Sequence, residues 1–66
     1  METINLNSST ITSASFENGV MTLTFATGRS YAYTVSESVF RGLVTAPSAG
    51  RFFSTNVRSQ FTGTRV

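Results

Sequence analysis

Apolar and polar residues alternate along the first half of the chain, which is the pattern of half-buried strands. The segment 20–26 alternates in this way, the segment 29–35 is rich in β-forming residues, and 11–17 precedes them as a third candidate strand. Asn18-Gly19 separates the first two segments and suits a two-residue type I′ turn, because both turn positions need a positive φ. Thr27-Gly28 is a weaker turn signal before the third. The pattern predicts a three-stranded antiparallel meander.

A helical spacing follows the predicted strands. Ser36 can cap a helix and Glu37 favours its first turn. The apolar side chains that recur on one face of this helix are Val39, Phe40, Leu43 and Val44. Pro47 is expected to end it, because the residue before a proline is driven out of the helical region.

A second, shorter helix is predicted after a tight loop at residues 48–50. Phe53, Val57 and Phe61 recur every four residues, as in a helix packed on the first one. The tail at 62–66 is expected to fray. The predicted fold class is α+β, with a three-stranded antiparallel β-meander followed by two short helices on one sheet face, in a single domain spanning residues 1–66.

Counting the register through two two-residue turns separates the faces of the predicted sheet. The apolar face, which the helices should cover, collects Ala14, Phe16, Met21, Leu23, Phe25 and Ala32. The opposite face collects Ser13, Ser15, Thr22, Thr24, Tyr31 and Tyr33. There the two tyrosines are predicted to form a base-stacking platform, a subunit interface, or both. A three-residue turn containing Gly28 is the alternative, and it would move both tyrosines into the core.

Composition restricts the chemistry that this fold can perform. The chain has no histidine and no cysteine, so the usual general base, thiolate nucleophile and zinc ligands are missing. Its three carboxylates, Glu2, Glu17 and Glu37, fall at a terminus, a predicted turn and a predicted helix start, and are not expected to converge. We therefore expect no enzymatic activity, cofactor or metal, and a protein that acts by binding.

The charge pattern points to an anionic ligand. The net charge is only +2, but all five basic residues are arginines, whose planar guanidinium grips phosphate or carboxylate bidentately and stacks on flat rings. Arg51 and Arg58 are the first candidates, because they flank the predicted 48–50 loop and the second helix, where backbone amides could also meet an anion.

Four further side chains complete the predicted ligand site. Tyr31 and Tyr33 are candidates as stacking groups. Ser48 and Asn56 are candidates as hydrogen-bonding groups beside the arginines, although Ser48 could equally close the turn and Asn56 could cap a helix.

A tyrosine-x-tyrosine motif follows a turn glycine in this chain, as Gly28, Tyr31, Ala32 and Tyr33. Further matching positions are Ser9, Ile11, Val39, Phe40, Leu43, the loop Ala46-Pro47-Ser48-Ala49-Gly50, Phe52, Phe53, Asn56, Val57 and Arg58. From Ser9 to Phe61 the chain thus resembles the KTSC domain family, which occurs at the C-terminus of some lysyl-tRNA synthetases and as free-standing bacterial and phage proteins. Ser36 departs from a frequent proline, and Phe61 lacks the hydroxyl of a frequent tyrosine.

Three kinds of binding follow from these observations. The synthetase attachment of the family implies RNA binding, although the positive charge is low for that role. A compact phosphate-bearing nucleotide needs fewer arginines, so we rank first a phage-type oligomeric sponge that sequesters such a ligand, for example a cyclic nucleotide signal. The third hypothesis is a host-protein interaction module that uses an edge strand or the tyrosine face.

The expected cellular location of the protein rests on two features that the sequence lacks. No apolar run approaches the roughly 18 residues of a membrane span. The opening METINLNSST has neither the basic start nor the apolar stretch of a signal peptide. We expect a cytoplasmic protein, in the host cytoplasm if phage-encoded, with no membrane partner.

The short chain predicts self-association. Its 66 residues lie below the roughly 70–80 at which one core stabilises a domain comfortably, and disulfides are excluded. Light scattering coupled to gel filtration should show a homo-oligomer at micromolar concentration. A monomer that melts cooperatively would contradict this prediction.

Overall fold

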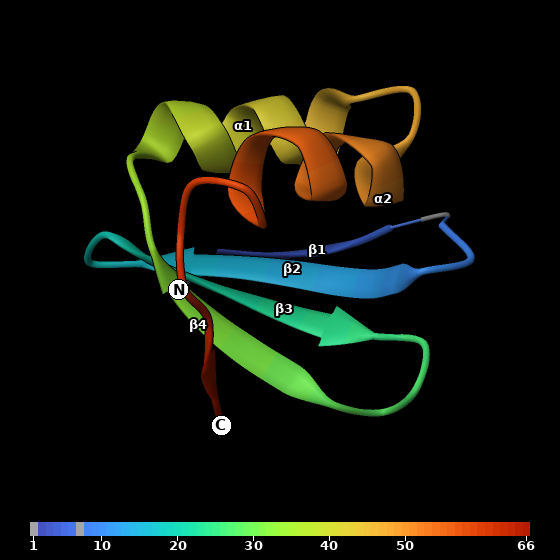
Figure 1. Cartoon of the computed structure of the whole chain (residues 1–66), viewed down its shortest axis with the longest axis horizontal. Coiled ribbons are helices and arrows are strands. Elements are labelled where there is room, and N and C mark those ends of the chain that lie inside the picture. Colours follow the sequence, from blue (N-terminus) through green and yellow to red (C-terminus); the bar gives the residue numbers. More distant parts are fainter. Residues whose placement is uncertain (1, 7) are drawn as a thin grey trace.

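The strands form one antiparallel sheet in which neighbours in sequence are neighbours in space (Figure 1). The computed structural model describes residues 2–6 and 8–66. The strands are β1 (Glu2–Asn5), β2 (Ile11–Glu17), β3 (Val20–Phe25), β4 (Ser30–Thr34) and β5 (Thr64–Arg65). The helical segments are α1 (Glu37–Thr45), α2 (Ala49–Phe52) and the π-helix η1 (Phe53–Val57). Both helices cover the same face of the sheet, so the α+β class is confirmed.

The sheet has five strands where three were predicted. β1 pairs with β2, and Ile4 lies opposite Ala14 on the face that packs against the core. β5 forms within the tail that was expected to fray, and its Thr64 and Arg65 pair with β4. Both additions are edge strands; β5 has only two residues, too few for alternation to mark it in the sequence, whereas β1 has four.

The first hairpin follows its local signal. Asn18 has a φ of 53° and Gly19 a φ of 79°, so both turn positions are in the left-handed region. Glu17 lies directly opposite Val20. The predicted two-residue turn and the register between β2 and β3 are confirmed.

The second hairpin differs from the predicted register. Its turn has three residues, Ala26 to Gly28, and the Phe25 N–H donates to the Arg29 carbonyl oxygen over 2.8 Å. Gly28 supplies the left-handed position with a φ of 92°, as three-residue hairpin turns require. One extra turn residue exchanges the two faces of every position in β4, because side chains alternate with a period of two.

This shift corrects the placement of the tyrosines. Tyr31 lies opposite Leu23 and Tyr33 opposite Met21, so both tyrosines are on the helix-covered face. Ala32 pairs with Thr22 on the uncovered face instead of joining the core. The predicted tyrosine platform on the open face is therefore wrong, and that face carries mainly hydroxyl side chains.

The first helix agrees with its predicted boundaries, whereas the second begins earlier than predicted. α1 starts after Ser36 and ends before Ala46, although the Ser36 side chain makes no capping bond. Ser48 caps α2 by accepting from the Arg51 N–H over 3.3 Å. The predicted 48–50 loop is wrong, because Ala49 already belongs to the first turn of α2.

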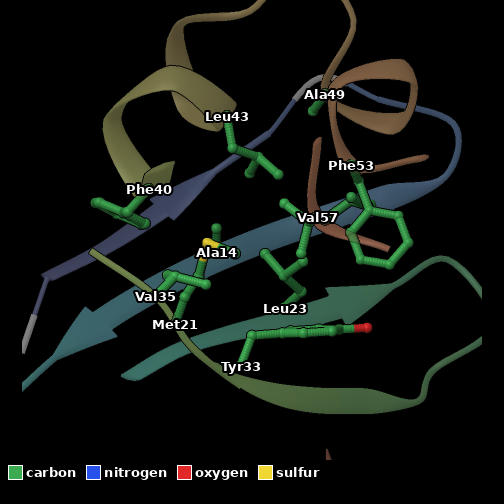
Figure 2. Packing of buried hydrophobic residues seen from close by; sticks show 11 residues of the cluster. Ala14, Met21, Leu23, Tyr33, Val35, Phe40, Leu43, Ala49, Phe53 and Val57 are labelled. Carbon is green, nitrogen blue, oxygen red and sulfur yellow. The ribbon is translucent and has the colours of Figure 1, made fainter. Parts of the chain in front are cut away.

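The core lies between the sheet and the two helices (Figure 2). Its buried members are Ile11, Ala14, Met21, Leu23, Tyr33, Val35, Phe40, Leu43, Ala49, Phe53 and Val57. The register shift between Ile11 and Ser13 lets Ile11 share the core face with Ala14. Phe16 stacks on Phe40 with ring centroids 5.2 Å apart, which joins the sheet to α1.

Truncation of Leu23 and Thr22 tests this assignment of faces. Leu23 is fully buried, so Leu23→Ala should lower the free energy of unfolding by about 2–5 kcal/mol. Thr22→Ala, on the open face of the same strand, should cost less than about 1 kcal/mol. Chemical denaturation measures both variants, and similar losses would mean that the faces are misassigned.

Candidate ligand-binding cleft

A cleft of about 720 Å³ opens where the β3–β4 turn meets η1. Its walls come from the loop before β2, the β3–β4 turn, β4, η1 and the residue after η1. The lining residues are Ser9, Thr10, Phe25, Ala26, Thr27, Arg29, Tyr31, Tyr33, Phe53 and Arg58. Two of these are arginines and none is acidic. The volume lies within the range of roughly 300–1,000 Å³ that is usual for small-molecule sites.

Four aromatic rings form a continuous edge-to-face series along the cleft. Ring centroids lie 5.7 Å apart for Tyr31 and Phe25, 5.2 Å for Phe25 and Phe53, and 5.6 Å for Phe53 and Tyr33. Tyr33 and Phe53 are buried at 6 and 8 % exposure. Phe25 and Tyr31 are half-buried, so they are the rings that a ligand can reach. A flat ring could pack against them at little cost, because the other two rings already hold them in place.

The two arginines of the cleft are exposed. Within the described residues, neither Arg29 nor Arg58 makes an ion pair or a side-chain hydrogen bond. Arg29 follows Gly28 directly and comes just before β4. It lies two residues before Tyr31, so both side chains lie on the helix-covered face of the sheet. An unpaired guanidinium beside half-buried aromatic rings can accept a phosphate without first breaking an internal bond.

The π turn of η1 explains how Arg58 reaches the cleft. The Arg58 N–H donates to the Phe53 carbonyl oxygen over 2.8 Å, which is an i to i+5 bond. Arg58 therefore follows Phe53 by one turn and lines the same cleft. In an unbroken α-helix, residues five apart are rotated by roughly 140° around the axis, and Arg58 would face elsewhere.

Burial changes the acidity of Tyr33. Desolvation raises the pKa of its hydroxyl above the ordinary value of 10.0, and the neighbouring Tyr31 adds to the rise. The Arg58 guanidinium acts in the opposite direction. Tyr33 therefore stays protonated at neutral pH, and its hydroxyl is available as a neutral hydrogen-bonding group at the cleft.

The structure divides the predicted site residues between two places. Tyr31, Tyr33 and Arg58 come together in the cleft. Arg51, Ser48 and Asn56 instead line a second, smaller depression of about 390 Å³ beside Pro47.

The same π turn accounts for this separation. Residues seven apart share one face of a regular α-helix, but the extra residue in the π turn rotates Arg51 and Arg58 apart. Ser48 acts as the cap of α2, a structural role other than the turn closure that was its alternative in the sequence.

Sequence reasoning missed several residues of the cleft. Arg29 was not among the candidates, although its spacing from Tyr31 and Tyr33 along one strand places all three on one face. Phe25 was assigned to the core, and it also forms part of the cleft wall. Thr10 and Phe53 enter the cleft through tertiary packing, for which the local sequence carries no signal.

Residues 2–6 and 8–66 contain no group of three or more His, Cys, Asp or Glu side chains that could hold a metal ion. No helix formed by these residues is long and apolar enough to cross a membrane.

Comparison with known proteins places this arrangement in a family. The chain belongs to the KTSC domain family, whose sequence model matches residues 7–61. The crystal structure of a KTSC domain protein from Yersinia pestis superimposes with a TM-score of 0.91 at 25 % identity, covering 98 % of this chain and 96 % of that one. No curated protein matches the chain. The resemblance inferred from the tyrosine-x-tyrosine motif is thus confirmed.

Tyr33 should make stability depend on pH in the alkaline range. Its raised pKa means that the folded chain holds this proton more tightly than the unfolded chain does. The contribution is complete below the unfolded value of 10.0 and is lost as pH rises through the higher folded pKa. Denaturant unfolding at pH values from about 9 to 11 should show a smaller alkaline loss for Tyr33→Phe than for the parent. Equal losses would exclude Tyr33 as the source.

Proposed function

We propose that this chain is a non-catalytic binding module that holds a phosphate-bearing nucleotide in the cleft. The observation that carries the proposal is that two half-buried aromatic rings share one opening, which no carboxylate lines, with two arginines that have no partner among the described residues. A nucleotide presents the matching groups, a flat base and an anionic phosphate. The base would pack on Phe25 and Tyr31, and the phosphate would meet Arg29 and Arg58.

Sequestration is the activity that such a site supports. The polar groups of the cleft are hydroxyls and guanidiniums, and the chain has no histidine or cysteine. Hydroxyls without a neighbouring general base are poor nucleophiles. A module of this kind holds its ligand without converting it, which is how a nucleotide sponge works.

The size of the cleft favours a compact ligand over a long strand. Proteins that bind single-stranded RNA combine a basic groove along the backbone with several stacking positions. Here the accessible rings and both arginines belong to one opening. A mononucleotide or a small cyclic dinucleotide supplies one or two phosphates for the two cations of the cleft.

Removal of the cleft arginines tests the proposal. Arg58→Ala and Arg29→Ala should each weaken the binding of adenosine 5′-monophosphate roughly 10- to 100-fold, which corresponds to about 1.5–3 kcal/mol for a hydrogen bond to a charged group. Arg51→Ala is the matched control, since it removes the same charge outside the cleft and should change affinity less than about threefold. Calorimetry measures affinity, and thermal melting checks that each variant folds.

The choice of ligands separates the remaining alternatives. Calorimetry with a cyclic dinucleotide, adenosine 5′-monophosphate and short single-stranded RNAs of increasing length should show saturable binding of the compact ligands. Affinity that grows with strand length and falls steeply with salt would replace the proposal with RNA binding. If no nucleotide binds, the nucleotide proposal is wrong.

A further inference from the structure

We propose that Arg65, on the C-terminal strand β5, is a third phosphate-binding residue of the cleft, and that the site therefore prefers nucleotides that carry two phosphates. This inference rests on the proposed function and names the class of ligand more narrowly. It assigns a ligand-binding role to a segment beyond residue 61, where the match to the family model ends.

Strand pairing places Arg65 on the same face of the sheet as Tyr31. Arg65 lies directly opposite Tyr31 in the antiparallel pair of β5 and β4. Directly opposed residues of such a pair project from the same face, with Cβ atoms about 4.5–5.5 Å apart. Tyr31 lines the cleft and Arg65 itself does not, so we infer that the long Arg65 side chain reaches the cleft from beside Tyr31.

The segment leading into β5 is fixed against the cleft by close packing. Gly63 lies so near the Tyr33 ring that an added Cβ would be 2.5 Å from its Cζ and 2.7 Å from its hydroxyl oxygen. On the other side, the Val66 N–H donates to the Ser30 carbonyl oxygen over 3.1 Å. Figure 1 shows this tail running from the helices to the edge of the sheet beside β4. Arg65 is thus held in place by backbone contacts before and after it.

The charges around the cleft argue for more than one phosphate. Arg65 is exposed and, within the part of the chain that the structure describes, has no ion-pair partner. Arg29 and Arg58 line the cleft with Tyr31, and Arg65 lies opposite the same tyrosine, which gives three guanidiniums for one site. One terminal phosphate carries a charge of about −1.5 to −2 at neutral pH, which leaves at least one arginine uncompensated. A second phosphate on the same ligand would neutralise it.

Two ligands that share a base test this inference. Calorimetry should compare adenosine 5′-monophosphate with adenosine 3′,5′-bisphosphate on the parent, Arg65→Ala, Arg65→Lys and the control Arg51→Ala. The parent should bind the bisphosphate more tightly. Arg65→Ala should weaken bisphosphate binding about tenfold, as for the loss of one charge-assisted contact, and should change monophosphate binding less than about threefold. Arg65→Lys should retain part of the preference, because it keeps the charge but loses the planar fork.

The possible outcomes separate this inference from the proposed function. If Arg65→Ala binds both ligands as the parent does, or loses both equally, the role of Arg65 is wrong while nucleotide binding stands. If the parent binds neither ligand, both conclusions fail. Thermal melting of Arg65→Ala excludes a loss caused by unfolding, and Thr64→Ala, altered on the opposite face of β5, should bind both ligands as the parent does.

Discussion

The three-residue turn between β3 and β4 is the constraint on which the cleft depends. Gly28 takes the left-handed conformation that a three-residue turn needs. The extra turn residue shifts the register of β4 by one position, which exchanges its two faces. Tyr31 and Tyr33 consequently point toward the helices, where Phe25 and Phe53 complete the ring series. A two-residue turn would place the tyrosines on the open face and leave η1 packed against Ala32. The composition of the cleft is thus decided at a turn that contributes few of its side chains.

Features with a local cause could be predicted from the sequence. Asn18-Gly19 determines its own turn because few dipeptides accept a positive φ at both positions. The limits of α1 follow from Pro47 and from apolar spacing within one segment. Features that depend on distant partners could not be predicted. β5 exists because β4 offers it an unpaired edge, and its two residues carry no strand signal of their own.

The kinds of residue in the candidate site could be predicted better than the places of those residues in the fold. Arginine and tyrosine were expected to bind an anionic aromatic ligand, and Tyr31, Tyr33 and Arg58 do lie together. Arg51, Ser48 and Asn56 lie in the second depression instead. The apolar spacing of Phe53 and Val57 fits an α-turn and a π-turn equally well. The sequence pattern therefore could not show where Arg58 would point. Membership of the KTSC family accounts for the fold and leaves the ligand to be inferred from the cleft itself.

The π turn also bears on how this domain could diverge. Such a turn is equivalent to an α-helix that has gained one residue, and its hydrogen bonds are easily reorganised. Loss of a single codon between Phe53 and Val57 would restore a regular helix, and the apolar residues could still face the core. Arg58 would turn away from the aromatic rings in the same step. One short deletion could thus leave the fold intact and remove an arginine from the cleft, so that relatives with the same architecture need not share the proposed ligand.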